Sequence, residues 1–134
     1  MTVVKSDVSP VRSEHDVVLA RQTVRRLAQE LGFGIVDQTK IVTAASELAR
    51  NVVVYGRGGE MRWHVVSDGA RVGLRLDFVD QGPGIPDVKQ AMTDGWTSGG
   101  GLGLGLSGAR RLVNDFEIDT AVGRGTRVSV TRWK

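Results

Sequence analysis

The chain has no cysteine among its 134 residues, which excludes disulfides, thiol catalysis and cysteine-ligated metal sites. Aromatic residues make up only 5% of the sequence, and no apolar run reaches the roughly 20 residues that a membrane-spanning helix needs. The first residues also lack the pattern of a secretory signal. These absences predict a soluble globular protein, and we expect it in the cytoplasm.

A strong charge of one sign is absent as well. The net charge is +3, and the lysines and arginines are spread along the chain rather than clustered. Binding of nucleic acid needs a concentrated basic patch, so this class of function is disfavoured. The two histidines, His15 and His64, lie far apart without ligand-like spacing, so we expect them at the surface or in a strand rather than on a metal.

What is present is an ordinary globular composition, 40% hydrophobic and 25% charged, at a length that fits one domain over residues 1–134. The first segments predict an edge strand over Thr2–Val8 that Pro10 ends. A helix should follow, capped by Ser13 or Asp16 and stopped by Gly32.

The rest of the apolar pattern completes the order β-α-α-β-β-loop-α-β-β, with a long irregular segment before the last helix. This order predicts an α+β fold, a two-layer sandwich with a mostly antiparallel sheet and helices on one face. The expected elements are a helix over Val36–Tyr55, strands over Met61–Val66 and Arg71–Val79, an irregular segment over Asp80–Gly105, a helix over Leu106–Phe116, and strands over Glu117–Val122 and Thr126–Trp133.

Glycine is dense in one place, the run from Gly99 to Gly105, where leucines alternate with glycines. Each glycine inside a regular element costs roughly 0.5–1 kcal/mol relative to alanine, so a run like this indicates backbone that bends or approaches a ligand closely. Backbone N–H groups at the start of the following helix can bind phosphate oxygens. A flexible linker is the plainer interpretation, although linkers are normally polar and these leucines must be buried.

Two familiar glycine motifs do not fit this run. It lacks the Gly-Lys-Ser/Thr of a P-loop. It also follows a loop rather than a buried strand, and no βαβ unit surrounds it, which disfavours a Rossmann site.

Three further features contribute polar groups. Glu47 and Asn51 lie four residues apart and share one face of the second helix, although many solvated helix surfaces carry such pairs. Asp80 follows a strand and precedes Gly82 and Gly84, which allow a ligand to approach the backbone, although the same residues also suit a plain surface turn. The last feature is the hairpin turn Gly123-Arg124-Gly125-Thr126, which is weak evidence by itself.

In this order the four features resemble the boxes of the GHKL superfamily of ATPases and kinases, which includes gyrase, MutL and sensor histidine kinases. The N box corresponds to Glu47 and Asn51, the G1 box to Asp80-x-Gly82-x-Gly84, the G2 box to Gly101-x-Gly103-x-Gly105, and the G3 element to Gly125-Thr126. The length leaves room only for the nucleotide-binding module, which is similar to the anti-sigma-factor and switch-kinase branch of bacterial stress signalling.

The resemblance implies an ATP site between the second helix and the segment Asp80–Gly105. Asp80 would accept a hydrogen bond from the adenine amino group, Asn51 would coordinate Mg²⁺, and the glycine run would close over the phosphates. Glu47 would act as general base toward the attacking hydroxyl. The residues assigned to nucleotide binding are Asn51, Asp80, Gly82, Gly84, Ile85, Gly101, Leu102, Gly103, Leu104, Gly105, Leu106 and Thr126.

The resemblance also implies protein partners rather than nucleic acid or a membrane. In this branch the phosphate acceptor is a serine or threonine of a STAS-domain antagonist, and the released kinase activates a PP2C-type phosphatase. Arg21 matches a partner-binding arginine of the anti-sigma branch, although it also reads as a solvated charge on an amphipathic helix. The alternative function is a non-catalytic module that binds ATP and acts as an anti-sigma factor or phosphatase activator.

Overall fold

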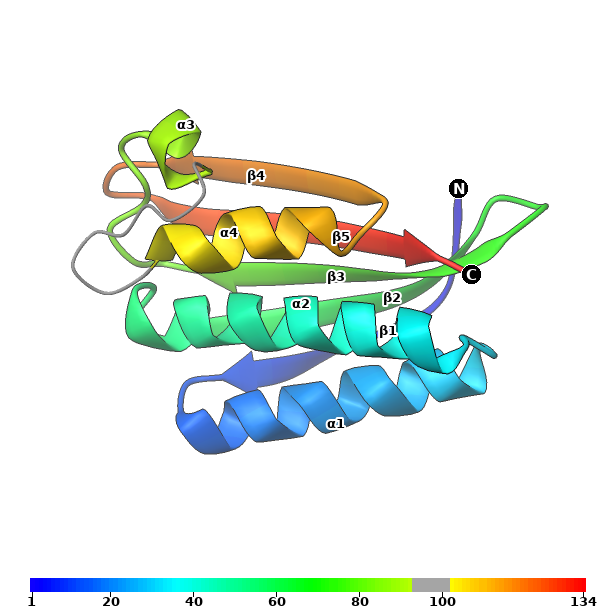
Figure 1. The fold of residues 1–134 in the computed structure, drawn as a ribbon. Helices are drawn as coiled ribbons and strands as arrows, with labels where there is room; N and C mark the ends of the chain where they lie inside the picture. Colours follow the sequence, from blue (N-terminus) through cyan, green and yellow to red (C-terminus); the bar gives the residue numbers. More distant parts are fainter. Residues whose placement is uncertain (93–101) are drawn as a thin grey trace.

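The structure is a computed structural model that describes residues 1–92 and 102–134, the side chains of 90, 91 and 102–105 excepted. In this part of the chain, five antiparallel strands form one sheet in the order β1-β2-β3-β5-β4. Figure 1 shows α1, α2 and α4 on one face of the sheet, which confirms the predicted two-layer α+β sandwich. The strands are β1 (Thr2–Val11), β2 (Gly59–Ser67), β3 (Val72–Asp80), β4 (Asp115–Ala121) and β5 (Gly125–Trp133); the helices are α1 (Glu14–Glu30), α2 (Ile35–Val54), α3 (Val88–Ala91) and α4 (Leu102–Arg111).

Local side-chain chemistry sets the bounds of the first helix. The hydroxyl of Ser13 accepts a hydrogen bond from the N–H of Asp16 at 3.3 Å, so Ser13 is the N-cap. Asp16 lies inside the helix, where its carboxylate accepts from the N–H of Arg12. Gly32 follows the helix with φ +81°, a left-handed conformation that favours glycine.

The expectation that Pro10 ends the first strand is wrong. The strand continues to Val11, and Pro10 pairs with Glu60 of β2. β1 lies at the edge of the sheet, where only one side of the backbone pairs and a proline is tolerated.

The last helix and the segment before it also differ from the sequence-based expectation. α4 begins at Leu102, inside the glycine run, and ends at Arg111 rather than at Phe116, which belongs to β4. The segment expected to be irregular also contains the short helix α3. α4 packs against α2, and burial of Leu106 and Ala109 there outweighs the low helix propensity of glycine.

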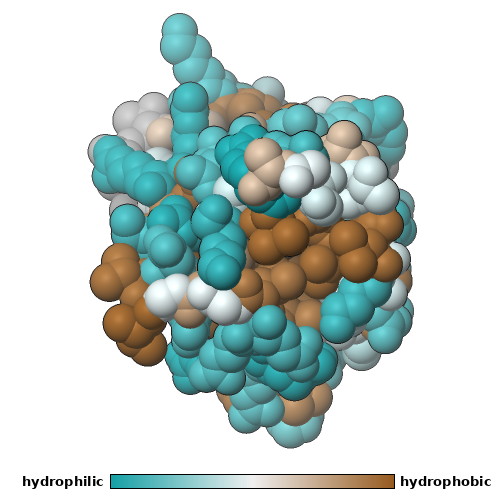
Figure 2. Space-filling view, turned by 90° about the vertical axis from the view of Figure 1, so that its right-hand side faces the viewer, coloured by the Kyte–Doolittle hydropathy of each residue, from teal (hydrophilic) through white to brown (hydrophobic). Residues whose placement is uncertain are grey.

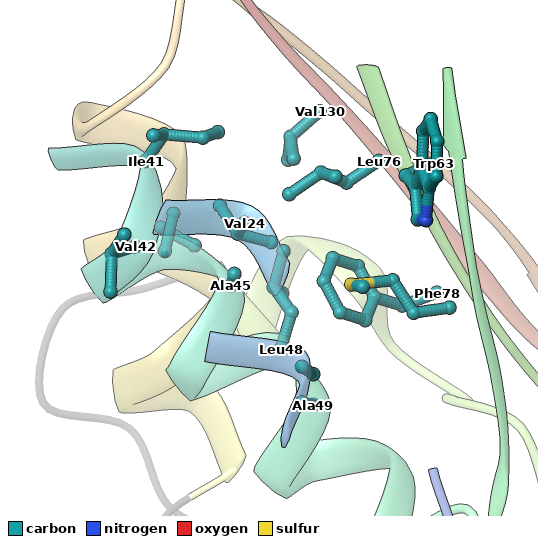
Figure 3. Packing of buried hydrophobic residues seen from close by; sticks show 14 of the residues in the cluster. Val24, Ile41, Val42, Ala45, Leu48, Ala49, Trp63, Leu76, Phe78 and Val130 are labelled. Carbon is teal, nitrogen blue, oxygen red and sulfur yellow. The ribbon is translucent and has the colours of Figure 1, made fainter. Parts of the chain in front are cut away.

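The hydrophobic core lies between the helices and the sheet. In Figure 3, side chains of α1 and α2 such as Val24, Ile41 and Leu48 point toward Leu76 and Phe78 of β3. All five are at most 1% exposed. This packing fixes α2 against the middle of the sheet, and α2 and β3 supply many of the residues described next.

The end of the molecule that carries both termini is hydrophobic in the middle and hydrophilic around it (Figure 2). Exposed large hydrophobic residues at the starts of β1 and α2 include Val3, Val4, Ile35 and Val36. No helix of the described residues is long and apolar enough to cross a membrane.

Candidate functional site

A cavity of about 230 Å³ opens at the end of the molecule opposite the termini, where α2 and β3 end and β5 begins. Its walls are mostly apolar, and a few polar groups converge on it, which is typical of small-molecule sites. The lining residues are Leu48, Asn51, Val52, Tyr55, Gly56, Phe78, Asp80, Pro83, Gly84, Ile85, Pro86, Leu106, Thr126 and Val128.

Asp80 is the charged residue among those that line the cavity. It is the last residue of β3, and its Oδ1 accepts a hydrogen bond from the N–H of Gly82 at 2.9 Å. Burial raises the pKa of Asp80 above its ordinary value, although the backbone N–H groups of Gly82 and Thr126 partly oppose this effect. A half-buried carboxylate with free acceptor capacity is suited to a ligand that donates a hydrogen bond.

Glycines allow the chain to close tightly around Asp80. A Cβ on Gly56 would lie 2.4 Å from the Asp80 carboxyl carbon, and a Cβ on Gly82 would lie 2.8 Å from the Cα of Gly56. Gly84 has φ +79°, and a Cβ there would lie 2.2 Å from the carbonyl oxygen of Ala121. Side chains at these three positions would therefore displace the carboxylate or the loop that forms the cavity wall.

The hydroxyl of Thr120 in β4 holds that loop to the sheet. It accepts from the N–H of Ile85 at 2.9 Å and donates to the carbonyl oxygen of Gly125 at 3.1 Å. The hydroxyls of Thr120 and Thr126 also lie 2.8 Å apart in a hydrogen bond that either can donate, and each oxygen has two lone pairs. The oxygen of Thr126 therefore keeps acceptor capacity at the cavity.

Two buried polar atoms, one in the last turn of α2 and one on its C-cap residue, have no hydrogen-bond partner among the described residues. They are the Nδ2 atom of Asn51 and the hydroxyl of Tyr55, four residues later, and both residues line the cavity. An unpaired buried polar group costs about 1–3 kcal/mol, so both atoms are suited to bonding with a ligand.

Glu47 does not line the cavity, although it precedes Asn51 by about one helical turn. Its side chain is 42% exposed and lies 3.9 Å from the guanidinium of Arg50, which also reaches Glu14 of α1 at 3.8 Å. This carboxylate is therefore accessible from solvent, at the side of α2 that faces α1.

The structure thus gathers many of the residues predicted for the site at one end of the sheet. Gly82 does not line the cavity but donates a hydrogen bond from its N–H to Asp80. The predicted residues that line the cavity are Asn51, Asp80, Gly84, Ile85, Leu106 and Thr126. Gly101 and the preceding glycines lie outside the described residues, and Leu102–Gly105 are described only as helical backbone.

Sequence reasoning missed several residues of the site. Tyr55 was named only as the last residue of the expected helix Val36–Tyr55, and Gly56 was given no role in the site. Thr120 lies 35 residues from Ile85 in sequence, so no local motif marks it. For Tyr55 and Gly56 the available signal was their place four and five residues after Asn51.

Comparisons with known proteins agree with this geometry. The family model of histidine kinase-, DNA gyrase B- and HSP90-like ATPases matches residues 36–134. The chain is 46% identical over 130 residues to the serine/threonine-protein kinase RsbT of Bacillus subtilis, across 96% of this chain and 98% of that protein.

More distant relatives are anti-sigma F factors. That of Thermoanaerobacter sp. is 26% identical over 120 residues, across 85% of this chain and 82% of the relative. That of Clostridium novyi is 28% identical over 115 residues, across 81% and 80%.

Among solved structures, the RsbU and RsbW domains of a Mycobacterium tuberculosis protein superpose with a TM-score of 0.66 at 20% identity. The match covers 98% of this chain and 33% of that one. At this identity the likeness concerns the fold, which is the same sandwich.

Proposed function

The chain belongs to the family of histidine kinase-, DNA gyrase B- and HSP90-like ATPases, and we propose that it transfers phosphate from ATP to a serine or threonine of a STAS-domain antagonist. The enzyme class is that of a protein serine/threonine kinase. The observation that carries the proposal is the cavity, which combines apolar walls with the half-buried carboxylate of Asp80 and the unpaired amide of Asn51.

The adenine base occupies the apolar part of this cavity, between side chains such as Leu48 and Ile85. The carboxylate of Asp80 accepts a hydrogen bond from the exocyclic amino group of the base. Guanine has a carbonyl oxygen at that position, which would face the carboxylate without a proton between them. We therefore expect the site to prefer ATP over GTP.

The amide of Asn51 is suited to hold Mg²⁺ through its carbonyl oxygen, since rotation of the amide exchanges its oxygen and nitrogen. Mg²⁺ commonly binds one or two protein oxygens together with substrate phosphates, and no cluster of three acidic or histidine residues occurs among the described residues. The bound cation would neutralise charge on the phosphates. Backbone N–H groups at the start of α4, inside the glycine run, are proposed to assist by binding phosphate oxygens.

Glu47 is the proposed general base. It accepts the proton of the attacking hydroxyl while the oxygen forms a bond to the γ-phosphorus and the bond to ADP breaks. Its exposure is consistent with this role, because the acceptor belongs to another protein and must approach from solvent.

The released enzyme would then activate a PP2C-type phosphatase, so that two partners compete for one protein. Arg21 of α1 is exposed and has no ion pair among the described residues, which supports a contact with one of these partners. The similarity to anti-sigma F factors supports a second candidate, a module that binds ATP and a sigma factor without transferring phosphate.

The test is to mix the purified chain, Mg-ATP and a STAS-domain protein from the same organism and to follow phosphate by mass spectrometry. We expect Glu47→Ala to abolish transfer and to keep ATP affinity. Glu30→Ala is the matched control and should keep transfer, because Glu30 is an exposed carboxylate at the opposite end of α1. If Glu47→Ala transfers phosphate normally, Glu47 is not the general base. If the wild type transfers no phosphate but binds a sigma factor, the second candidate function is favoured.

A further inference from the structure

A second hollow lies behind the nucleotide cavity and shares Gly56 and Asp80 with it. It lies between the end of β1 and the loop that joins α2 to β2. Arginines of two segments meet there: Arg12 follows β1, and a Cβ on Gly58, next to Arg57, would lie 3.5 Å from the Cγ of Arg12. We call this feature the arginine hollow; its lining residues are Arg12, Gly56, Arg57, Gly58, Gly59, Glu60, Arg62, Val79, Asp80 and Gln81.

Two of these arginines are unpaired. The guanidinium groups of Arg12 and Arg57 have no ion pair or hydrogen-bond acceptor among the described residues, and both residues are exposed. The third, Arg62, is engaged by Glu60 at 2.6 Å. Elsewhere the same residue type is commonly matched with a carboxylate, as in Arg26, Arg71, Arg75, Arg124 and Arg132. The hollow also contains the carboxylates of Glu60, which engages Arg62, and of Asp80, which accepts from the N–H of Gly82. Neither carboxylate forms an ion pair with Arg12 or Arg57 among the described residues, so these two guanidinium groups remain available to a partner.

The backbone at Arg57 adds a second observation. Arg57 has φ +62° and is the non-glycine residue with a positive φ in the described part of the chain. Glycines occupy positions 56, 58 and 59, so the residue type that relieves this strain is present on either side but not here. Strained backbone of this kind is enriched at functional sites.

We propose that the arginine hollow binds a carboxylate-bearing loop of the protein partner. An exposed ion pair improves association by only about fivefold at most, so two exposed arginines would not retain a small free anion. Within a protein interface that excludes water, close charge pairs contribute about tenfold or more each. The exposure of Arg12 and Arg57 therefore favours a protein over a free ion as the source of the carboxylate.

The position of the hollow agrees with this occupant. Arg12 lies two residues before Glu14, and Glu14, Arg50 and Glu47 form a row of side chains from α1 to α2. A partner that brings its hydroxyl to Glu47 must dock at this end of the molecule, close to Arg12. The inference rests on the proposed kinase function and names the chemistry by which the enzyme holds its substrate.

The test uses the STAS-domain protein that the wild-type enzyme phosphorylates. Arg57→Asn removes the charge and keeps a residue that tolerates the left-handed backbone, whereas Arg57→Lys keeps a charge at the same place. Arg12→Glu reverses the other charge. Lys134→Glu is the matched control, because Lys134 is exposed and lies at the opposite end of the molecule. Affinity for the STAS-domain protein is measured by calorimetry at two salt concentrations, and ATP affinity is measured in parallel.

We expect Arg57→Asn and Arg12→Glu each to weaken partner binding about tenfold, with a smaller dependence on salt, while ATP affinity stays unchanged. Arg57→Lys should keep most of the affinity, and Lys134→Glu all of it. Unchanged partner affinity in both charge variants would overturn the inference, and so would a loss confined to ATP affinity, which would assign the hollow to the nucleotide. A wild-type chain that binds no STAS-domain protein would contradict the proposed function instead.

Discussion

Replacement of Asp80 by asparagine separates nucleotide binding from stability. Asparagine keeps the shape of the side chain and one oxygen that can accept the N–H of Gly82. Its NH₂ group then faces the cavity, where it meets the amino group of adenine as donor against donor. Loss of one hydrogen bond to a charged acceptor costs about 1.5–3 kcal/mol, so the dissociation constant for ATP should rise about 10- to 150-fold.

The stability of Asp80→Asn should be equal to or higher than that of the wild type. Burial raises the pKa of Asp80, so this carboxyl binds more protons in the folded chain than in the unfolded chain. Its ionisation therefore opposes folding as the pH rises past the usual carboxyl pKa, and the penalty is present at pH 7. Because asparagine does not ionise, Asp80→Asn should melt no lower than the wild type.

Asp77 provides a matched control on the same strand. It is 8% exposed and lies on the other face of the sheet, 3.1 Å from both His64 and Arg75. Burial opposes its ionisation, but hydrogen bonds that include those of Arg75 and His64 outweigh this effect and lower the pKa of Asp77. Asp77→Asn should therefore lower the melting temperature and leave ATP affinity unchanged.

The assay pairs calorimetric titration with ATP and a thermal melt at pH 7 for the wild type and both variants. ATP binding by Asp80→Asn within twofold of the wild type would refute the role of Asp80 as adenine acceptor. A large drop in its melting temperature would refute the argument from burial.

Three further changes test other parts of the structure. Thr120→Val leaves the N–H of Ile85 without its acceptor and should cost about 1–3 kcal/mol in urea unfolding, whereas Thr120→Ser should keep most of the stability. Arg57→Gly should relieve about 1–2 kcal/mol of strain in the left-handed backbone, whereas the greater freedom of glycine in the unfolded chain should cost about 0.5–1 kcal/mol. Urea unfolding should therefore show a small gain in stability, and a loss of stability would contradict the strain at Arg57. Because the pKa of Asp77 is lowered in the fold, its ionised carboxylate stabilises the fold above the usual carboxyl pKa, about 3.9, and this stabilisation is lost as the pH falls below that value. In urea unfolding between pH 3 and 5, the free energy of unfolding of Asp77→Asn should therefore fall less steeply with decreasing pH than that of the wild type. Equal slopes would show that Asp77 does not cause this pH dependence.

Local signals in the sequence were enough for many of the helix and strand bounds. The hydroxyl of Ser13 and the left-handed Gly32 act within a few residues, so the first helix could be placed from them. The start of α4 could not, because its glycines favour a loop locally and only packing on α2 makes the helix stable. Pro10 misled although an edge strand was predicted, because an edge strand tolerates proline and this strand continues through Pro10 to Val11.

The residues of the candidate site also differ in whether local sequence could identify them. Asp80 and Gly84 belong to a compact motif that ends a strand, and Asn51 lies at helical spacing after Glu47. Spacing made these residues candidates, and the resemblance to the GHKL boxes assigned them to a nucleotide site. Thr120 and Gly56 act through contacts with residues distant in sequence, such as the Asp80 side chain that Gly56 leaves room for. Those contacts exist only after the sheet has formed.

The cavity is lined by residues between Leu48 and Val128, so β1 and α1 contribute none of its walls. The family model likewise begins at residue 36. Substitutions at the surfaces of β1 and α1 would therefore leave the walls of the cavity as they are. A change of protein partner through contacts on these two elements would not require any change in the residues that surround the nucleotide.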